Sequence, residues 1–256
     1  MKIGLCLWAY TPDVGGAFTF QENLLNALRV NESSHEVFCF YYGNELPLQE
    51  GYLRWVRLGK SPGKHQERLL NDAVLKHAIE LVWFITVPIH ETVDVPYIFT
   101  VWDLAHRVHP YFPEVSVSGW TWDKREQFFQ YVLPRAAYVI TGTDAGKKEV
   151  SNFYQIPAER IRVVPFAVPS FALQAHKKNG SAALLPKSPY LFYPAQFWPH
   201  KNHIVLLRAL KILIEQEQLD FSIVFTGSDK GNLKFIQQAV ANLGLRERVQ
   251  IGRAHV

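Results

Sequence analysis

The distribution of apolar and polar residues divides the first part of the chain into alternating strands and helices. Nearly continuous apolar runs predict strands at Ile3–Trp8, Glu36–Tyr42, Leu53–Leu58, Glu80–Val87, Pro96–Leu104, Ala136–Thr143 and Ile161–Val168. Apolar residues three or four positions apart predict helices at Phe18–Val30, His65–Ile79, Thr121–Pro134 and Asp144–Tyr154. Largely apolar strands that alternate with helices are typical of a mostly parallel sheet with helices on both faces. We therefore expect residues 1–172 to form a doubly wound domain of the α/β class.

The alternation stops after residue 172 and then begins again. Residues 173–189 are rich in Lys, Ser, Gly and Pro, which is typical of a solvated linker between domains. Within residues 190–256 the pattern predicts two strands and two helices, at Tyr190–Tyr193, Asn202–Gln216, Asp220–Thr226 and Lys230–Leu243. This is about half of a doubly wound domain, so we expect a second α/β domain that is incomplete.

Composition and charge exclude several classes of protein. The chain has 256 residues, of which 48% are hydrophobic and 20% charged, so it can bury a sizeable core. The net charge is +4 and no run of five basic residues occurs, so nucleic-acid binding is not indicated. No stretch of about 18 apolar residues exists, which excludes a membrane span. The N-terminus is better explained as a strand than as a signal peptide.

The two cysteines, Cys6 and Cys39, lie inside apolar strand-like runs. Buried thiols in a reducing compartment are the simplest explanation for such cysteines. We therefore expect a cytoplasmic protein without disulfides. Two cysteines are also too few for a structural zinc site made of four.

The first candidate site is Gly15-Gly16, between the first predicted strand and the first predicted helix. In an open α/β sheet, the loop after the carboxyl end of a strand is the usual ligand position. Two glycines let the backbone approach a ligand closely, and the N–H groups that begin the next helix favour an anion such as phosphate. The pair does not form a G-x-G-x-x-G motif, which disfavours NAD, and a flexible turn is the alternative explanation.

The second candidate site begins where the predicted strand Pro96–Leu104 gives way to polar residues. Asp103, His106 and His109 are spaced at three and three, which a metal site, an acid/base group or contact with a polar substrate would each explain. No further cysteine or acidic ligand is clearly paired with them, which disfavours a metal. In the structural alternative, Asp103 caps a helix and His106 packs in the interior.

The third and fourth candidate sites follow the two strands predicted in residues 190–256. Lys201 precedes a predicted helix, where a cation is unfavourable for the helix dipole. Anion binding would explain this lysine, because the ammonium and the helix N-terminus would converge on one phosphate. A solvated surface lysine is the alternative. The small-residue loop at Gly227 is explained equally well as the wall of a nucleotide pocket or as an ordinary turn.

Together these motifs resemble those of the group 1 glycosyltransferases, also called family 4, of the GT-B fold. The resemblance runs from Met1 to about Gln250, and its most specific piece is FYPAQFWPHKNH, followed by a helix, a strand and Thr226-Gly227. The other segments that carry it are, in chain order, Gly15-Gly16, Trp102–His106, Pro110–Glu114, Ile140–Asp144 and Ile161–Val168.

The resemblance implies two facing Rossmann-like domains that transfer a sugar with retention of configuration, without a cofactor or a bound metal. The donor would be a UDP- or GDP-sugar, and the acceptor a glycan, a lipid-linked sugar or a polysaccharide. Asp103 and His106 would be catalytic, and Trp102 and Thr143 would lie on the acceptor side. The implied donor-binding residues are Gly15, Gly16, Gln196, Lys201, Asn202 and Gly227, among which Lys201 would contact the diphosphate.

Three positions depart from the family pattern. Ala195-Gln196 stands where many relatives have Gly-Arg, so one of two usual phosphate cations is missing or supplied elsewhere. Trp102-Asp103 stands where relatives often have His-Asp, and Phe166-Ala167 replaces the usual Asn-Gly.

The C-terminal part departs most from the family. The paired-glutamate motif, E-x7-E, would lie further along than this chain extends, so we expect an inactive fragment. The last residues, Ile251–Val256, look like an in-frame translation of a sequencing-library adapter, and we expect them to be non-native. The alternative is a native segment, because the family often has a strand and a glycine here. A sugar-nucleotide epimerase of the same architecture and a non-catalytic nucleotide or sugar binding module are the alternative functions. The family often contacts the cytoplasmic face of a membrane, although no clean basic amphipathic helix supports this here.

Overall fold

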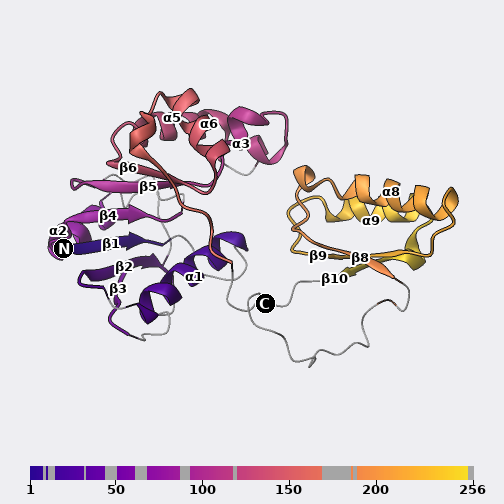
Figure 1. The fold of residues 1–256 in the computed structure, drawn as a ribbon, viewed down its shortest axis with the longest axis horizontal. Helices are drawn as coiled ribbons and strands as arrows, with labels where there is room; N and C mark the ends of the chain where they lie inside the picture. Colours follow the sequence, from indigo (N-terminus) through magenta and orange to yellow (C-terminus); the bar gives the residue numbers. More distant parts are fainter. Residues whose placement is uncertain are drawn as a thin grey trace. The chain divides into compact units, whose positions relative to one another are not determined.

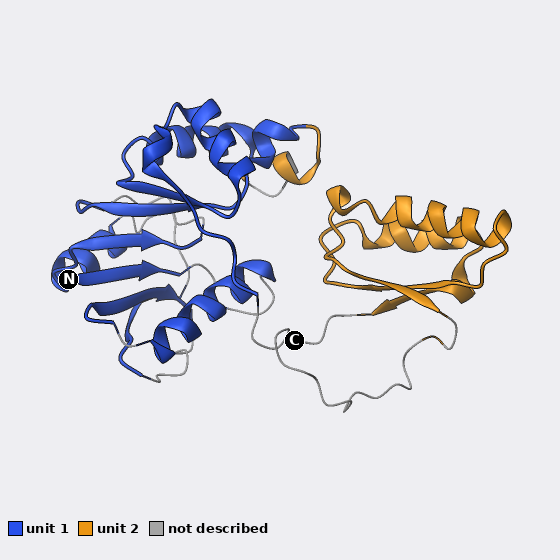
Figure 2. Ribbon diagram, in the orientation of Figure 1, with its two compact units in different colours: residues 1–110, 121–175 blue, residues 111–120, 176–256 orange. Residues whose placement is uncertain are grey.

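The computed structural model describes residues 1–7, 10, 15–31, 33–43, 51–60, 68–86, 93–117, 120–168, 186 and 189–252. The chain divides into two compact units (Figure 2). Unit 1 comprises residues 1–110 and 121–175, and unit 2 comprises residues 111–120 and 176–256. The expected linker, residues 173–189, contains this division and lies almost wholly outside the described residues. The segment Tyr111–Trp120, which we expected in the N-terminal domain, groups with unit 2.

Unit 1 is built on a seven-stranded sheet in which all neighbouring strands are parallel (Figure 1). The strand order is β3-β2-β1-β4-β5-β6-β7, so the order reverses between β1 and β4. In doubly wound sheets this switch point is where ligands bind. The strands are β1 (Lys2–Cys6), β2 (Glu36–Tyr42), β3 (Arg54–Gly59), β4 (Leu81–Phe84), β5 (Tyr97–Val101), β6 (Tyr138–Thr141) and β7 (Ile161–Val163).

The helices of unit 1 cover this sheet. They are α1 (Gly16–Val30), α2 (Leu69–Lys76), α3 (Ala105–Val108), α5 (Trp122–Val132) and α6 (Asp144–Tyr154), with a short 3-10 helix at Ala158–Arg160. The apolar run in β2 explains the architecture, because Val37–Tyr42 is buried throughout, as strands of a parallel sheet require. Cys6 and Cys39 are both buried in the sheet as free thiols, which confirms their predicted burial.

Most predicted elements of residues 1–172 are present. Glu36–Tyr42 and Asp144–Tyr154 match to the residue. The predicted helix His65–Ile79 is α2, which ends where Ala78 adopts a left-handed φ of 53°. Parts of three predicted elements, at Trp8, residues 65–67 and Val87, lie outside the described residues.

Several predicted strands are shorter than expected, and for two of them the backbone shows the reason. The strand predicted at Pro96–Leu104 is β5, which stops early because Asp103 bonds the backbone two residues ahead and begins a turn. The strand predicted at Ile161–Val168 is β7. The N–H of Val164 still donates to the carbonyl of Thr141 at 2.8 Å, but Pro165 has no N–H with which to continue the ladder.

Unit 2 contains a three-stranded parallel sheet of order β10-β9-β8, with its two long helices together on one face (Figure 1). Its elements are α4 (Glu114–Val117), β8 (Tyr190–Pro194), a 3-10 helix (Pro199–Lys201), α8 (His203–Glu215), β9 (Ser222–Thr226), α9 (Leu233–Asn242), a 3-10 helix (Arg246–Arg248) and β10 (Val249–Gly252). Leu207 and Leu210 of α8 and Ile236 of α9 pack with Phe225 of β9 in the core. Within the described residues, no helix is both long and apolar enough to cross a membrane.

The short helices were not predicted, and strand β10 was expected only as the alternative to non-native residues. Helices α3 and α4 have four residues each, which is too short for a helical period to show. Strand β10 pairs Ile251 with Phe225 and Gly252 with Thr226. Two of the residues that we expected to be non-native therefore continue the sheet, and residues 253–256 lie outside the described part of the chain.

Candidate functional site

The candidate residues of unit 1 lie where its strands end. Gly15 precedes α1 in the loop after β1, Trp102 and Asp103 follow β5, and Thr143 follows β6. Because these strands are parallel, their carboxyl ends form one edge of the sheet. The topology therefore gathers the four residues at the edge where open α/β sheets bind ligands.

Gly15 and Gly16 have different backbone conformations and surroundings at the start of α1. Gly15 adopts a φ of 75°, which glycine tolerates at no steric cost, and its carbonyl accepts the N–H of Thr19 at 3.1 Å. Gly16 is exposed, and no atom lies within 4 Å of the position that a Cβ would take. Helix α1 has no side-chain cap and no acidic residue in its first turn, so the N–H groups at its start are suited to an anion.

Asp103 and Trp102 order the loop after β5. The exposed Asp103 accepts a hydrogen bond at Oδ1 from the N–H of Ala105, at 2.9 Å, which begins α3. The half-buried Trp102 donates from Nε1 to the carbonyl of Ile85 at 3.1 Å. Ile85 directly follows β4, so this bond ties together the ends of two neighbouring strands.

The side chain of His106 points into the interior and is fully buried. Its Nε2 lies 3.2 Å from Oε2 of Glu126 and 3.1 Å from the hydroxyl of Tyr154, and its ring stacks on Phe129 with centroids 5.5 Å apart. Although only three residues separate His106 from Asp103, the two side chains do not meet at the exposed edge. This arrangement matches the structural alternative, in which Asp103 begins a helix and His106 packs inside.

Glu126 of α5 is the centre of the buried network that holds His106. Arg107 donates to both carboxylate oxygens, with Nε 2.8 Å from Oε2. Gln130 donates to Oε1 at 2.7 Å, and the hydroxyl of Tyr154 donates to Oε2 at 3.1 Å. The network therefore joins α3, which follows Asp103, to α5 and α6.

The charge states of the network follow from burial and these hydrogen bonds. Burial by itself would raise the pKa of Glu126, but hydrogen bonds from Arg107, Gln130 and Tyr154 hold that pKa below its usual value. Burial is the main cause that lowers the pKa of His106, against the opposing effect of Glu126. At neutral pH the network thus contains an ionised glutamate, a charged arginine and a neutral histidine.

Thr143 lies at the expected edge and caps a helix. Its Oγ1 accepts a hydrogen bond from the N–H of Gly146 at 3.0 Å, as the N-cap residue of α6. Thr143 is exposed, so its hydroxyl also faces solvent at the carboxyl end of β6.

The spacing of Asp103, His106 and His109 does not assemble a metal site. Asp103 is exposed while His106 is buried, so the side chains diverge. Across the described ranges, no group of three or more His, Cys, Asp and Glu side chains is arranged to hold a metal ion.

In unit 2, the loops that follow β8 and β9 are in direct backbone contact. A Cβ placed on Gly227 would lie 2.3 Å from the carbonyl oxygen of Ala195. Nearby, the N–H of Phe197 donates to the carbonyl of Ser228 at 3.0 Å, and Phe197 forms an isolated parallel bridge with Asp229. Gly227 is therefore what allows these two loops to meet at the carboxyl edge of the sheet.

Lys201 is exposed at the end of the 3-10 helix, and α8 begins two residues later at His203. The carbonyl of Lys201 accepts the hydroxyl of Tyr193 at 2.9 Å, which ties the loop back to β8. Between them, Asn202 has a left-handed φ of 52° and makes no side-chain cap. Lys201 and the N-terminus of α8 therefore lie together, as the sequence predicts. Helix α8 has no acidic residue in its first turn that would compete with an anion for the helix N–H groups.

Gln196 and Lys230 also lie at the carboxyl edge of the unit 2 sheet. The Oε1 of Gln196 accepts a hydrogen bond from Nε1 of Trp198 at 3.0 Å. The ammonium of Lys230 lies 5.9 Å from the centroid of the Trp198 ring. Sequence reasoning missed Lys230, although it directly follows the loop that carries Gly227. A second lysine is therefore present beside the loop that carries Lys201.

The segment Tyr111–Trp120 supports this loop within unit 2. The carboxylate of Glu114 accepts a hydrogen bond from the backbone N–H of His200 at 3.2 Å and also bonds the His200 ring. The ring of Phe112 lies 5.8 Å from the same imidazole. Burial would raise the pKa of Glu114, but hydrogen bonds from its own backbone and from His200 hold it below its usual value. An ionised Glu114 thus holds His200, the residue before Lys201, by hydrogen bonds.

Comparison with known proteins gives structural matches only, because no protein-family model and no curated protein matches the sequence. A glycosyltransferase from Rickettsia africae matches with a TM-score of 0.66 at 15% identity, covering 99% of this chain and 68% of that chain. WaaG, a glycosyltransferase involved in lipopolysaccharide biosynthesis, matches with a TM-score of 0.67 at 16% identity, covering 99% of this chain and 70% of that chain. HepE from Anabaena, in complex with UDP-glucose, matches with a TM-score of 0.66 at 15% identity, covering 100% and 70%.

These similarities establish the fold. Unit 1 is a Rossmann-like domain, unit 2 contains a second, three-stranded parallel sheet, and the chain matches glycosyltransferases of the GT-B type along nearly its whole length. The predicted fold class and the resemblance to GT-B glycosyltransferases are confirmed. The chain spans about 70% of the length of the matched transferases.

Proposed function

We propose that this chain belongs to a retaining glycosyltransferase that uses a nucleotide-diphospho-sugar as donor. The observation that carries the proposal is the edge of unit 2, where exposed Lys201 precedes the uncapped N-terminus of α8. The Gly227 loop lies against the same loop at Ala195. Cations and backbone N–H groups gathered at the end of parallel strands are suited to a diphosphate.

The donor would be held by this edge of unit 2. Lys201 and the first N–H groups of α8 would bind the phosphates, with Gln196, Asn202 and Gly227 forming the surrounding backbone and polar surface. Lys230 would supply the second cation, which the arginine of many relatives provides and which Gln196 cannot. The match to HepE, whose solved structures contain UDP and UDP-glucose, favours a UDP-sugar among the possible donors.

The acceptor would be a glycan, a lipid-linked sugar or a polysaccharide bound at the edge of unit 1. Gly15 and Gly16 would let a ligand approach the start of α1, and the exposed carboxylate of Asp103 would accept hydroxyl groups. Trp102 and Thr143 would line the same edge. His106 has no exposed surface, so we assign it the role of a positioning residue that fixes α3 behind Asp103.

The chemistry requires stabilisation of the leaving group. When the bond between the sugar and the nucleoside diphosphate breaks, negative charge develops on the phosphate oxygens. Lys201, Lys230 and the N–H groups of α8 would stabilise that charge without a bound metal, because they carry positive charge or positive partial charge.

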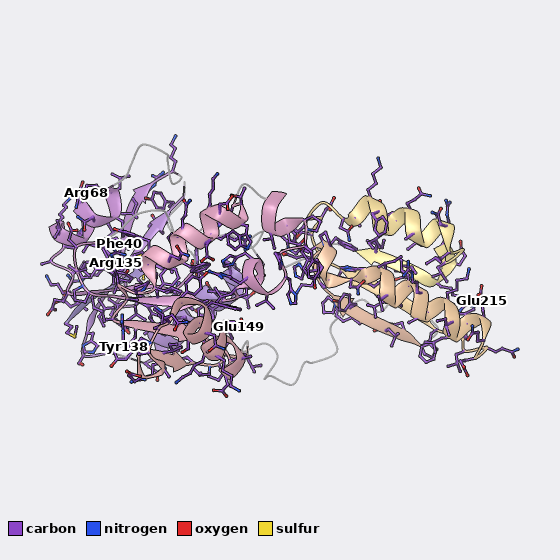
Figure 3. The ribbon with its side chains drawn as sticks, turned by 90° about the horizontal axis from the view of Figure 1, so that it is seen from above. Phe40, Arg68, Arg135, Tyr138, Glu149 and Glu215 are labelled. Atoms are coloured by element: carbon purple, nitrogen blue, oxygen red, sulfur yellow. The ribbon has the colours of Figure 1, made fainter. Side chains whose placement is uncertain are left out.

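Calorimetric titration of the chain with UDP tests the donor site. Loss of one charged hydrogen bond costs about 1.5–3 kcal/mol, so K201A should lower UDP affinity about 10- to 100-fold. The control is K211A, because Lys211 pairs with Glu215 at 3.5 Å near the opposite end of α8 (Figure 3). Equal UDP affinity of K201A and the unchanged protein would overturn the proposed donor site.

A further inference from the structure

Three aromatic side chains from distant parts of unit 1 meet at the carboxyl edge of its sheet. Phe20 comes from α1, Trp102 follows β5, and Phe166 follows β7. The centroid distances are 5.0 Å between Phe20 and Trp102, 5.1 Å between Trp102 and Phe166, and 4.9 Å between Phe20 and Phe166. We call these three side chains the aromatic triad.

Two departures from the family pattern are thus in contact with each other. Trp102 stands where relatives often have a histidine, and Phe166 stands where they usually have an asparagine. The structure brings these two aromatic replacements together, although 64 residues separate them in the chain. The family's polar side chains at this edge are replaced by one apolar surface.

The rings are held in place by their surroundings. The indole Nε1 of Trp102 donates to the carbonyl of Ile85 at 3.1 Å, which fixes the plane of that ring. Beneath Phe166 lies Gly142, at the end of β6, where an added Cβ would be 3.1 Å from the phenyl ring. The absence of a side chain at Gly142 therefore lets the Phe166 ring lie flat against the backbone.

The aromatic triad lies at the margin of the core of unit 1, against which Phe20 packs. Phe166 keeps 42% of its surface exposed, and Phe20 and Trp102 are only half-buried. A contiguous, partly exposed aromatic surface marks a binding surface more often than a scattered apolar residue does. Its place at the ligand-binding edge of a doubly wound sheet supports the same conclusion.

The chemistry of the surface selects the ligand. A pyranose ring has C–H groups on its flat faces and hydroxyl groups around its rim, so it can stack on an aromatic ring while its rim bonds to polar groups. Asp103, adjacent to Trp102 in the chain, has an exposed carboxylate that accepts hydroxyl groups and repels phosphate. A neutral sugar ring therefore fits this surface better than a nucleotide does.

We propose that the aromatic triad of Phe20, Trp102 and Phe166 is a stacking platform for a pyranose ring. This inference rests on the proposed function for the origin of that ring, which is either the acceptor glycan or the sugar of the donor. The shared chemistry is the apolar face of the sugar.

The test uses the full chain labelled with 5-fluorotryptophan, in which the fluorine resonance of Trp102 is identified by its loss in W102F. The probes are cellobiose, UDP-glucose and UDP. Cellobiose should shift the Trp102 resonance if the acceptor ring stacks, and UDP-glucose alone should shift it if the donor sugar stacks. A shift that UDP produces as strongly as UDP-glucose would overturn the proposal, and so would no shift with either sugar.

Two phenylalanine variants separate the loss of stacking on the sugar from an unspecific effect of removing an exposed phenylalanine. F166A should weaken the apparent sugar affinity about three- to tenfold, the scale of one aromatic contact. F235A removes a phenylalanine that is 57% exposed on α9 and should leave the titration unchanged. Equal effects of F166A and F235A would overturn the proposal. Calorimetry with UDP tests the donor site separately. Normal UDP binding without a sugar-dependent shift of the Trp102 resonance would reject the stacking platform and leave the proposed donor site standing.

Discussion

A Cβ on Gly227 would lie 2.3 Å from the carbonyl oxygen of Ala195, closer than any real contact between such atoms. The two residues belong to loops that leave neighbouring parallel strands, β8 and β9. Their contact brings the backbone of the Gly227 loop against the segment that leads to Lys201. The glycine is therefore a structural requirement of the proposed phosphate site.

The G227A variant should destabilise unit 2, because the methyl group cannot fit without moving the backbone of Ala195. Forcing extra atoms into a packed position typically costs about 1–3 kcal/mol, and here the obstacle is backbone. Urea unfolding followed by circular dichroism measures the loss. G252A is the matched control, since its Cβ would meet only Thr226 at an ordinary 3.8 Å. Equal urea midpoints for G227A and G252A would show that the loops after β8 and β9 are not in contact.

The two glycines before α1 should respond in opposite ways to alanine. G15A should lose about 1–2 kcal/mol of stability, because Gly15 has a φ of 75° that side chains rarely adopt. G16A should be neutral or slightly stabilising, because Gly16 is the first residue of the helix and has open space around it. Thermal unfolding of both variants measures the difference, and a greater loss for G16A would contradict the assigned conformations.

The E126Q variant should destabilise unit 1 by about 3 kcal/mol, because it leaves the Arg107 guanidinium beside a neutral partner in a largely buried network. The measurement is chemical denaturation monitored by fluorescence. E159Q, at an exposed glutamate of the same unit, should change stability by less than about 0.5 kcal/mol. If both variants unfold alike, the network does not hold α3 in place.

Acidification should weaken unit 2 through His203. Its ring is fully buried and stacks on Phe197 at 4.5 Å, and burial, aided by the charge of Lys201, lowers its pKa despite the Ala195 carbonyl. Below the usual histidine pKa of about 6.5, the unfolded chain takes up a proton that the folded unit resists, so stability falls as pH falls.

The H203F variant should remove that part of the pH dependence. Its unfolding free energy should change less than that of the unchanged protein between pH 7.5 and pH 5, because phenylalanine cannot bind a proton. Urea titrations at several pH values give the comparison. Identical slopes for the two proteins would mean that His203 titrates normally in the folded state.

Sequence periodicity was enough to predict the long elements, because their apolar faces repeat along the chain. Helix α6 covers Asp144–Tyr154 as predicted, and in the structure Thr143 caps its start while Gln155 ends it in a left-handed conformation. Strand β7 was predicted too long because the apolar residues continue after Pro165 has ended the hydrogen bonding. Short helices such as α3 leave no periodic signal.

The candidate sites were predictable only where they lie at strand ends. Lys201 and Gly227 could be placed in this way, because loops after parallel strands share one edge. The sequence offered the burial of His106 only as one alternative, because its partners Glu126 and Tyr154 are 20 and 48 residues away in the chain. Lys230 was missed for a similar reason, since its position over Trp198 depends on two loops coming together.

The most direct test of the account is hydrogen–deuterium exchange of the full chain with and without UDP, resolved by peptide. If the edge of unit 2 binds the diphosphate, UDP should slow exchange in peptides that cover residues 195–205 and 226–233. The same peptides of K201A should show much weaker protection. Protection confined to unit 1, or equal protection in K201A, would contradict the assignment of this edge as the donor site.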